Sequence, residues 1–553
     1  MAELSGSEIL ARQLALENID TVFTVYAGPM TAALPALVRE GVRVIGCRHE
    51  EQAGFMASAW GYITRRPGVV IVGSGPAMTN TVTSLYAAQG NGWPLVVLGG
   101  SAGGSARAQG PTRGFGGFQE TDQVAYAAPA CKWAVEVDYP ERIPELIHLG
   151  LGKAVSGRPG GVYIDFPGAL LNAEVPEERV QWRGAAPSVH EPHADPAGVE
   201  AIADLLAEAE RPLVLVGKGA AWSDASAPLQ RLVSLGIPFV ASPMGRGTIP
   251  DDDPRNAGAA RSAALSGADA VLMAGGRFNW IFNFGRPPAF APGVRLAQID
   301  LAAEEMYSAA ELEVGLVADC GAAVDQLCGV LEMRRLASAR SGWLQMLTDQ
   351  SARHRAALDE MMDSDSVPIS PYRLFRDVRD CLPRDATVTV DGEITLGIGR
   401  LVLPSFLPRH RLNSGITACM GVGVPYAIGA KLARPDQASI AMLGDYAFGA
   451  SAMEVETAAR VGAAVVFVIV NNGGISGRLG QNRGFRPEDP LIAGLLPVHY
   501  DKLAEMVDGY AARVERPGNI RPAVEEALAS GRVSVVNVLV DPEGGSRRGG
   551  GYL

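Results

Sequence analysis

Residues 439–476 read SIAMLGDYAFGASAMEVETAARVGAAVVFVIVNNGGIS and hold the most chemically specific pattern in the chain. An apolar strand ends at Gly444-Asp445, a helical segment follows, and a second apolar strand ends at Asn471-Asn472. Because two strands joined by a helix lie parallel, Asp445 and Asn472 should emerge at neighbouring carboxyl ends of one sheet. A carboxylate, an amide oxygen and a nearby backbone carbonyl are hard ligands suited to Mg²⁺, which normally also takes oxygens from a diphosphate. The stretch therefore predicts a site for a metal-bound diphosphate.

A plainer interpretation is an ordinary βαβ unit with a turn aspartate and a capping asparagine, since short motifs often match by chance. The spacing favours the cofactor site. Gly444-Asp445, an acidic helix with Glu454 and Glu456, an apolar strand and Asn-Asn resemble the diphosphate motif of thiamine-diphosphate enzymes. For the two glutamates we expect a helix-surface or subunit-interface role. The residues that this resemblance implies at the cofactor are Gly444 and Ala447 at the diphosphate, and Asp445, Asn472 and the carbonyl of Gly474 at Mg²⁺.

Length, charge and cysteine usage narrow the class of protein. The chain has 553 residues, which is too many for one ordinary core and predicts three or four domains. Its formal net charge of −12 disfavours nonspecific nucleic-acid binding, and its six cysteines lack the grouping of a zinc site or a disulfide framework. The longest apolar run is too short to span a bilayer, and the N-terminus has no secretory-signal pattern. We expect a cytoplasmic protein without a membrane partner.

Linkers rich in proline or in charge separate three segments in which strand and helix signals alternate. Such repeats predict parallel sheets with their functional loops at the carboxyl ends of strands. The predicted fold is therefore α/β, with three doubly wound parallel-sheet domains of the thiamine-diphosphate enzyme type. The predicted parts are a pyrimidine-binding domain over 1–172, a middle CoA- or nucleotide-binding domain over 196–335, a diphosphate- and Mg²⁺-binding domain over 371–541, and a flexible tail over 542–553.

The best candidate for a catalytic acid is Glu50, which ends the triplet Arg48-His49-Glu50 after a short strand. A lone glutamate at the start of a helix is usually only a favourable charge there. However, RHEEQAGFMASAWGY, followed by GSGPAMTN, resembles the pyrimidine-binding domain of the same enzymes. The resemblance implies that Glu50, not Glu51, contacts the aminopyrimidine ring and so promotes loss of the thiazolium C2 proton. It also implies that Asn80 helps to shape the pocket.

A further cofactor contact is predicted in SGITACMGVG, residues 414–423, at another strand end. A methionine there is more often core packing, but in the family a bulky apolar residue at this place buttresses the bent cofactor. The resemblance implies this role for Met420 and places the carbonyl of Ala418 at the cofactor's amino group. In the family the two halves of the site meet between two chains, which implies a dimer at least and commonly a tetramer.

Four motifs resemble the oxalyl-CoA decarboxylase and 2-hydroxyacyl-CoA lyase branch more closely than acetolactate synthases or benzaldehyde lyase. They are SGRPGGVYIDFP over 156–167, GKGAAWS over 217–223, GAARSAAL over 258–265 and GGRFNWIFNFG over 275–285. The resemblance implies that Arg261 and Asn279 contact CoA, and that Arg158, Lys218 and Asp300 hold an ADP activator. A solvated surface charge is the competing interpretation of each basic residue.

Two positions favour the lyase over the decarboxylase. Phe118-Gln119 stands where decarboxylases of this branch have Tyr-Glu, and Ser476 stands where they have tyrosine. The predicted reaction is cleavage of a 2-hydroxyacyl-CoA to formyl-CoA and an aldehyde or ketone, with Gln119 polarising the hydroxyl or adduct oxygen. The alternatives are an oxalyl-CoA decarboxylase, a CoA-independent carboligase, and a catalytically idle cofactor-binding regulator.

The proton carrier is the weak point of the lyase prediction. EDPLIAGLL, residues 488–496, looks like the short helix on which actinobacterial lyases of the 2-hydroxyisobutyryl-CoA type place a glutamate, but Ala493 stands at the acid's position. Loss of a general acid and base would weaken catalysis by roughly 10²–10⁴-fold unless water substitutes. Ile492 would narrow the acyl pocket.

Overall fold

The computed structural model describes residues 3–101, 117–185, 191–307, 310–334, 340–475 and 493–544. The described residues form two compact units. The first unit is built from residues within Met1–Val189, Ser414–Asp436 and Ser451–Ala463. The second unit is built from residues within His190–Asn413, Gln437–Ala450 and Ala464–Leu553.

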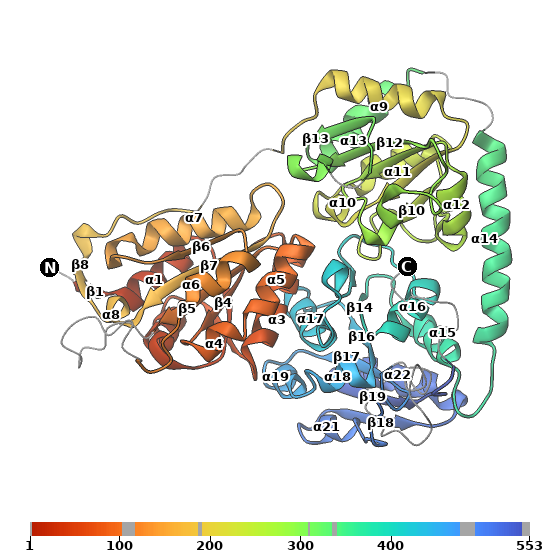
Figure 1. Cartoon of the computed structure of the whole chain (residues 1–553). Helices are drawn as coiled ribbons and strands as arrows, with labels where there is room; N and C mark the ends of the chain where they lie inside the picture. Colours follow the sequence, from red (N-terminus) through yellow and green to blue (C-terminus); the bar gives the residue numbers. More distant parts are fainter. Residues whose placement is uncertain are drawn as a thin grey trace. The chain divides into compact units, whose positions relative to one another are not determined.

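A six-stranded parallel sheet with the order β3-β2-β4-β5-β7-β6 organises the first unit (Figure 1, red to orange). Its central strand β4 is a run of apolar residues after one glycine, and every residue in it is buried, as expected for a parallel sheet covered on both faces. The strands are β2 (Thr21–Thr24), β3 (Arg43–Gly46), β4 (Gly68–Val72), β5 (Leu95–Ser101), β6 (Trp133–Glu136) and β7 (Gly161–Pro167).

Helices from distant parts of the chain cover this sheet. The most buried is α3 (Glu50–Thr64), which packs against β4, α5 and α17. Its small residues permit this, because a Cβ on Gly54 would meet the Ser84 hydroxyl at 2.0 Å. The helices of the unit include α1 (Gly6–Leu16), α2 (Ala33–Arg39), α4 (Pro76–Thr79), α5 (Val82–Asn91), α6 (Gln123–Ala127), α7 (Ile143–Val155), α8 (Gly168–Leu171), α17 (Gly423–Ala433) and α19 (Glu454–Arg460). The short strands β1 (Glu3–Ser5) and β8 (Glu174–Pro176) form a separate antiparallel pair.

The second unit contains two further parallel sheets (Figure 1, yellow-green and cyan to blue). The sheet with the order β10-β9-β11-β12-β13 comprises β9 (Pro212–Val216), β10 (Phe239–Ala241), β11 (Ala270–Ala274), β12 (Arg295–Asp300) and β13 (Val314–Val317). Its helices are α9 (Pro196–Glu208), α10 (Lys218–Trp222), α11 (Ser226–Ser234), α12 (Arg261–Gly267) and α13 (Cys320–Leu331), and the long helix α14 (Arg340–Met362) follows.

The last sheet has the order β15-β14-β16-β17-β19-β18. It comprises β14 (Thr387–Asp391), β15 (Arg411–Leu412), β16 (Ser439–Gly444), β17 (Val465–Asn471), β18 (Tyr510–Val514) and β19 (Ser534–Leu539). Its helices are α15 (Pro371–Cys381), α16 (Glu393–Val402), α18 (Asp445–Gly449), α21 (Lys502–Glu505) and α22 (Ile520–Ala529).

Three parallel sheets with intervening helices confirm the predicted fold class. The predicted neighbours β16 and β17 pair in parallel along their length, with Gly444 opposite Val470, so their carboxyl ends do meet at one edge. Within the described ranges, no helix combines the length and apolar character needed to cross a membrane.

Candidate functional site

Asp445 ties together two strand-end loops of the second unit. It begins α18 directly after β16, and its side chain is buried at 1% exposure. One carboxylate oxygen accepts hydrogen bonds from the backbone N–H groups of Gly473 at 2.7 Å and Gly474 at 3.0 Å, and the other accepts from Tyr446 N–H at 2.7 Å. Burial raises the pKa of Asp445, and these N–H bonds act in the opposite direction. The sequence prediction that Asp445 lies beside the Asn472–Gly474 turn is therefore confirmed in geometry.

The glycines around Asp445 leave room for a ligand. A Cβ on Gly444 would meet only the Cα of Gly392, at 4.0 Å, and a Cβ on Gly473 would meet nothing within 4 Å. Gly392 has φ +100° and Gly473 has φ +80°, which are left-handed values that favour glycine. The Gly473 and Gly474 N–H groups already donate to Asp445, so what this edge offers a diphosphate is the open space beside Gly444 and Gly473, with a cation to bridge the phosphate to the turn.

The donor set around Asp445 also fits Mg²⁺. Among the described residues, no group of three or more His, Cys, Asp and Glu side chains could hold a metal. A magnesium ion here would instead rely on one carboxylate, the buried amide of Asn472, the Gly474 carbonyl and oxygens of the diphosphate itself, which is the sparse protein coordination that Mg²⁺ tolerates. Ala447, also predicted at the diphosphate, is buried within α18.

Ala493 lies next to the predicted metal loop. Its carbonyl accepts the N–H of Ile475 at 3.0 Å, the N–H of Leu495 donates to the Gly473 carbonyl at 2.9 Å, and Gly474 and Gly494 form an antiparallel bridge. The residue at the expected position of a proton carrier is thus an alanine held against the Gly473–Gly474 turn. Ile492 and Ser476 lie outside the described residues.

In the first unit, the structure brings Glu50 and Asn80 together. Glu50 is the first residue of α3 and is half-buried, and the Asn80 side-chain amide donates to its Oε2 at 2.9 Å. Burial raises the pKa of the next residue, Glu51. Asn80 ends α4, which starts directly after the Gly73-Ser74-Gly75 turn.

The same turn supports Gln119. The Ser74 hydroxyl donates to the Gln119 side-chain oxygen at 2.7 Å, and Gln119 itself has φ +55°. A Cβ on Gly75 would lie 2.7 Å from the Gln119 carbonyl oxygen, so the backbones touch where only glycine fits. The neighbouring Phe118 side chain is 82% exposed. Sequence reasoning missed Ser74, whose only signal was its place in the GSGP turn.

A buried polar network holds this turn from below. Gly75 N–H donates to the Gln123 side-chain oxygen at 2.6 Å, and the Gln123 amide donates to Asp165 at 2.5 Å and to the Gly100 carbonyl at 3.0 Å. The Tyr163 hydroxyl donates to Asp165 at 2.6 Å. All of these groups are satisfied in a region without water access, which rigidifies the turn.

Ala418 and Met420 also belong to the first unit. Ala418 has φ +52°, and Met420 is 46% exposed rather than packed in the core. The segment before them is fixed on α5, where Asn91 accepts from Ile416 N–H at 3.1 Å and donates to the Ser414 carbonyl at 3.2 Å.

The two predicted CoA residues converge on one turn of the second unit. Arg261, at the start of α12, donates to the Ile281 carbonyl and lies over the Phe282 ring at 5.3 Å. The Asn279 side-chain oxygen accepts the N–H of Ile281 at 3.0 Å. Burial, with a smaller contribution from Arg400, lowers the pKa of Arg261 to about 10, so it remains a cation at neutral pH.

Arg400 is a further arginine of the second unit, which sequence reasoning did not single out. It lies in α16 and is half-buried, and burial together with Arg246 lowers its pKa. Arg246 donates to the Arg400 carbonyl at 2.9 Å and pairs with Asp251, which also accepts Ser405 N–H at 2.8 Å. Partly buried guanidinium groups placed near one another repel, and an anionic ligand would relieve this repulsion.

The three predicted ADP residues are divided between the two units. Arg158 lies in the first unit, where its guanidinium donates to the Gln89 and Gly90 carbonyls at the end of α5. Lys218 begins α10 and Asp300 ends β12, at strands separated by β11 in the sheet.

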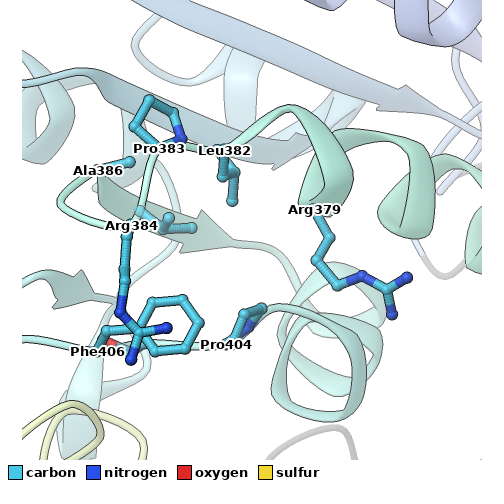
Figure 2. Close-up of a pocket in the computed structure, with 9 residues that line it drawn as sticks. Arg379, Leu382, Pro383, Arg384, Ala386, Pro404 and Phe406 are labelled. Carbon is cyan, nitrogen blue, oxygen red and sulfur yellow. The ribbon is translucent and has the colours of Figure 1, made fainter. Parts of the chain in front are cut away.

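A cavity of about 320 Å³ near the start of β14 holds none of the predicted site residues (Figure 2). Its two arginines are engaged elsewhere, since Arg384 pairs with Asp252 at 2.8 Å and stacks on Phe406, and Arg379 pairs with Asp380. The lining residues are Arg379, Leu382, Pro383, Arg384, Ala386, Val388, Pro404, Ser405 and Phe406.

Comparison with known families identifies the class. Models for the thiamine pyrophosphate enzymes match in three parts: the N-terminal TPP binding domain over 4–126, the central domain over 199–327 and the C-terminal TPP binding domain over 392–538. The chain belongs to the thiamine pyrophosphate (thiamine diphosphate) enzymes, as predicted.

Three relatives align over nearly the whole chain. A 2-hydroxyacyl-CoA lyase of Oryza sativa subsp. japonica is 34% identical over 99% of this chain and 97% of its own length. An oxalyl-CoA decarboxylase of Escherichia coli (strain K12) is 32% identical over 98% and 96%. An acetolactate synthase large subunit of Mycobacterium tuberculosis is 34% identical over 98% and 96%. The predicted lyase and decarboxylase branch is among these relatives.

Proposed function

We propose that this protein is a thiamine-diphosphate- and Mg²⁺-dependent lyase that cleaves short 2-hydroxyacyl-CoA to formyl-CoA and an aldehyde or ketone, reversibly. The observation that carries the proposal is the turn at Ile281–Phe282, which both Arg261 and Asn279 contact. A guanidinium held at such a turn suits the phosphates of CoA. The Phe118-Gln119 pair and the lyase relative add support.

Glycine turns and Asp445 would hold the cofactor's charged end. The diphosphate would lie against Gly444 and Ala447. Mg²⁺ would be bound by Asp445, Asn472 and the Gly474 carbonyl. When bound, thiamine diphosphate supplies a nucleophilic carbon and an electron sink. Ala418 and Met420 would support its pyrimidine and thiazolium rings.

Glu50 would exchange a proton with the pyrimidine ring, oriented by the Asn80 amide at 2.9 Å. The side-chain oxygen Oε1 of Gln119 accepts a hydrogen bond from the Ser74 hydroxyl. The Nε2–H groups of the same amide would then donate to a substrate oxygen. Phe118 would contact the acyl chain, and Ile492 would limit its size. Because Ala493 carries no acid, protonation of the product would use water.

We further propose the domain limits 1–172, 196–335 and 371–541 with a C-terminal tail over 542–553, and a homo-oligomer that is at least a dimer. Light scattering of the purified protein measures the oligomeric state. An ADP activator at Arg158, Lys218 and Asp300 stays a prediction, and its test is whether added ADP changes the rate.

The test of function is to incubate the holoenzyme with a short 2-hydroxyacyl-CoA and follow formyl-CoA and the carbonyl product by chromatography. Oxalyl-CoA and pyruvate serve as competing substrates in parallel reactions. Formyl-CoA with a matching amount of aldehyde or ketone supports the lyase. Carbon dioxide from oxalyl-CoA without lyase products would establish the decarboxylase instead, and acetolactate from pyruvate would establish the synthase.

A further inference from the structure

Glu454 is not a surface residue, which corrects the expectation from the sequence. It is the first residue of α19 and is 1% exposed. Glu456, two residues on, keeps 29% of its side chain exposed and pairs with Arg460 at 2.8 Å. The sequence predicts an acidic helix here, and the structure contains one. The pattern of residues in that helix does not show that Glu454 faces the residues before α3.

The Glu454 carboxylate is saturated with hydrogen bonds inside the first unit. Its Oε1 accepts the backbone N–H of Arg48 at 3.0 Å and that of His49 at 3.2 Å, and its Oε2 accepts the Thr457 hydroxyl at 2.6 Å. Hydrogen bonds to an ionised group are about twice as strong as neutral ones. Removing the carboxylate would leave two peptide N–H groups without their acceptor and so free this turn to move.

These two N–H groups belong to the residues that immediately precede Glu50. His49 is the N-cap of α3, and its ring nitrogen accepts the N–H of Glu51 at 3.2 Å. The other side of the same turn is also held by α19, because Arg460 donates to the Gly46 carbonyl at 2.7 Å. Helix α19 therefore clamps the β3–α3 connection from Gly46 to His49, and the backbone position of Glu50 follows from this clamp.

We infer that Glu454 is a positioning residue for Glu50. The inference rests on the proposed role of Glu50 in activating the cofactor. Glu454 fixes the peptide planes of residues 48 and 49, Asn80 fixes the carboxylate of Glu50, and together they define both ends of the catalytic side chain. A displacement of about 1 Å in such a group can cost ~10²-fold in rate. A purely structural carboxylate would affect stability alone.

The first experiment needs no cofactor. Hydrogen–deuterium exchange of the apoenzyme, followed by mass spectrometry, reports on the amides of residues 47–53. In Glu454→Ala these amides should exchange at least tenfold faster than in the wild type, and in Glu454→Gln, which keeps an acceptor oxygen, within threefold. Glu145→Gln is the control, because Glu145 is an acid of α7 in the same unit that pairs with Arg142 at 3.2 Å, and it should leave these amides unchanged.

The second experiment measures exchange of the C2 proton of bound thiamine diphosphate by quenched-flow NMR, without any CoA substrate. Glu454→Ala should lower this rate by 10–100-fold. Glu454→Gln should keep the rate within a few-fold of the wild type. Wild-type rates of both exchanges in a folded Glu454→Ala protein would overturn the inference. If Glu454→Ala does not fold, two other variants decide the question. Glu454→Gln keeps the acceptor oxygen, and Thr457→Val removes the hydroxyl that donates to Oε2. A lowered C2 rate in the first together with an unchanged rate in the second would overturn the inference, because the charge of Glu454 and not its hydrogen bonds would then control the rate.

The two proposals fail in different ways. Absence of formyl-CoA from the wild-type enzyme would refute the lyase function and leave the C2 exchange result intact. A wild-type C2 rate in Glu50→Gln would instead remove the role of Glu50 on which the inference rests.

Discussion

Replacing Arg261 by alanine should raise the Kd for CoA without a matching loss of protein stability. In the free protein, Arg261 is a half-buried cation whose pKa is lowered to about 10 by burial and by Arg400. Its guanidinium donates to the Ile281 carbonyl and lies over the face of Phe282. For stability, the substitution removes the repulsion from Arg400 together with the attractions to Ile281 and Phe282. For binding, it removes a cation that the phosphates of CoA would contact.

The magnitudes follow from these contacts. A hydrogen bond from a charged donor contributes about 1.5–3 kcal/mol, so its loss should raise the Kd for CoA by roughly 10–150-fold. In the free enzyme the substitution loses the cation–π contact and the hydrogen bond to the Ile281 carbonyl, and the relieved burial of the cation and the relieved repulsion with Arg400 offset part of that loss. The free energy of unfolding of the free enzyme should consequently fall by no more than about 2 kcal/mol.

Isothermal titration with CoA and urea denaturation of the free enzyme measure the two quantities. Arg295→Ala is the matched control, because Arg295 lies in the same unit but pairs with Glu208 at 2.9 Å and Glu313 at 2.7 Å on the surface. It should leave the Kd for CoA unchanged. An unaltered Kd in Arg261→Ala, or a Kd that rises only in step with a large loss of stability, would refute the placement of CoA at this site.

Three further predictions concern the other parts of the site. Gly75→Ala should destabilise the protein by about 1–3 kcal/mol, measured by denaturant unfolding, because its Cβ would press on the Gln119 backbone at a φ of +55°; an unchanged midpoint would show that the turn can move. Chelation of Mg²⁺ should release thiamine diphosphate, seen by equilibrium dialysis, and Asp445→Asn should require at least tenfold more Mg²⁺ to retain it; equal retention in both proteins would place the metal elsewhere. Tyr163→Phe should cost about 1–3 kcal/mol in urea unfolding, since it leaves the buried Asp165 with one donor fewer, and a loss below 0.5 kcal/mol would mean that water takes the hydroxyl's place.

The cofactor half-site around Asp445 was predictable from the sequence because its geometry is local. Two parallel strands joined by one helix must place their ends side by side, and Gly444 opposite Val470 shows that they do. Glu50 and Asn80 came from the resemblance of their motifs to the family and not from strand geometry, which leaves a lone glutamate at a helix start without a role. The described structure brings these two together at 2.9 Å, as expected for one pocket.

What the sequence by itself determined, then, is the family, the three α/β sheets and the residue types at the strand ends, because hydrophobic periodicity and strand-end motifs are properties of short segments. Only the tertiary structure decided which distant side chains share an environment. It buried Glu454 against the residues before Glu50 and placed Arg261 against Ile281 and Phe282, and both outcomes depend on how whole helices and turns pack. A charge on an amphipathic helix reads the same in sequence whether it faces water or the N–H groups of a neighbouring turn, and packing alone makes the difference.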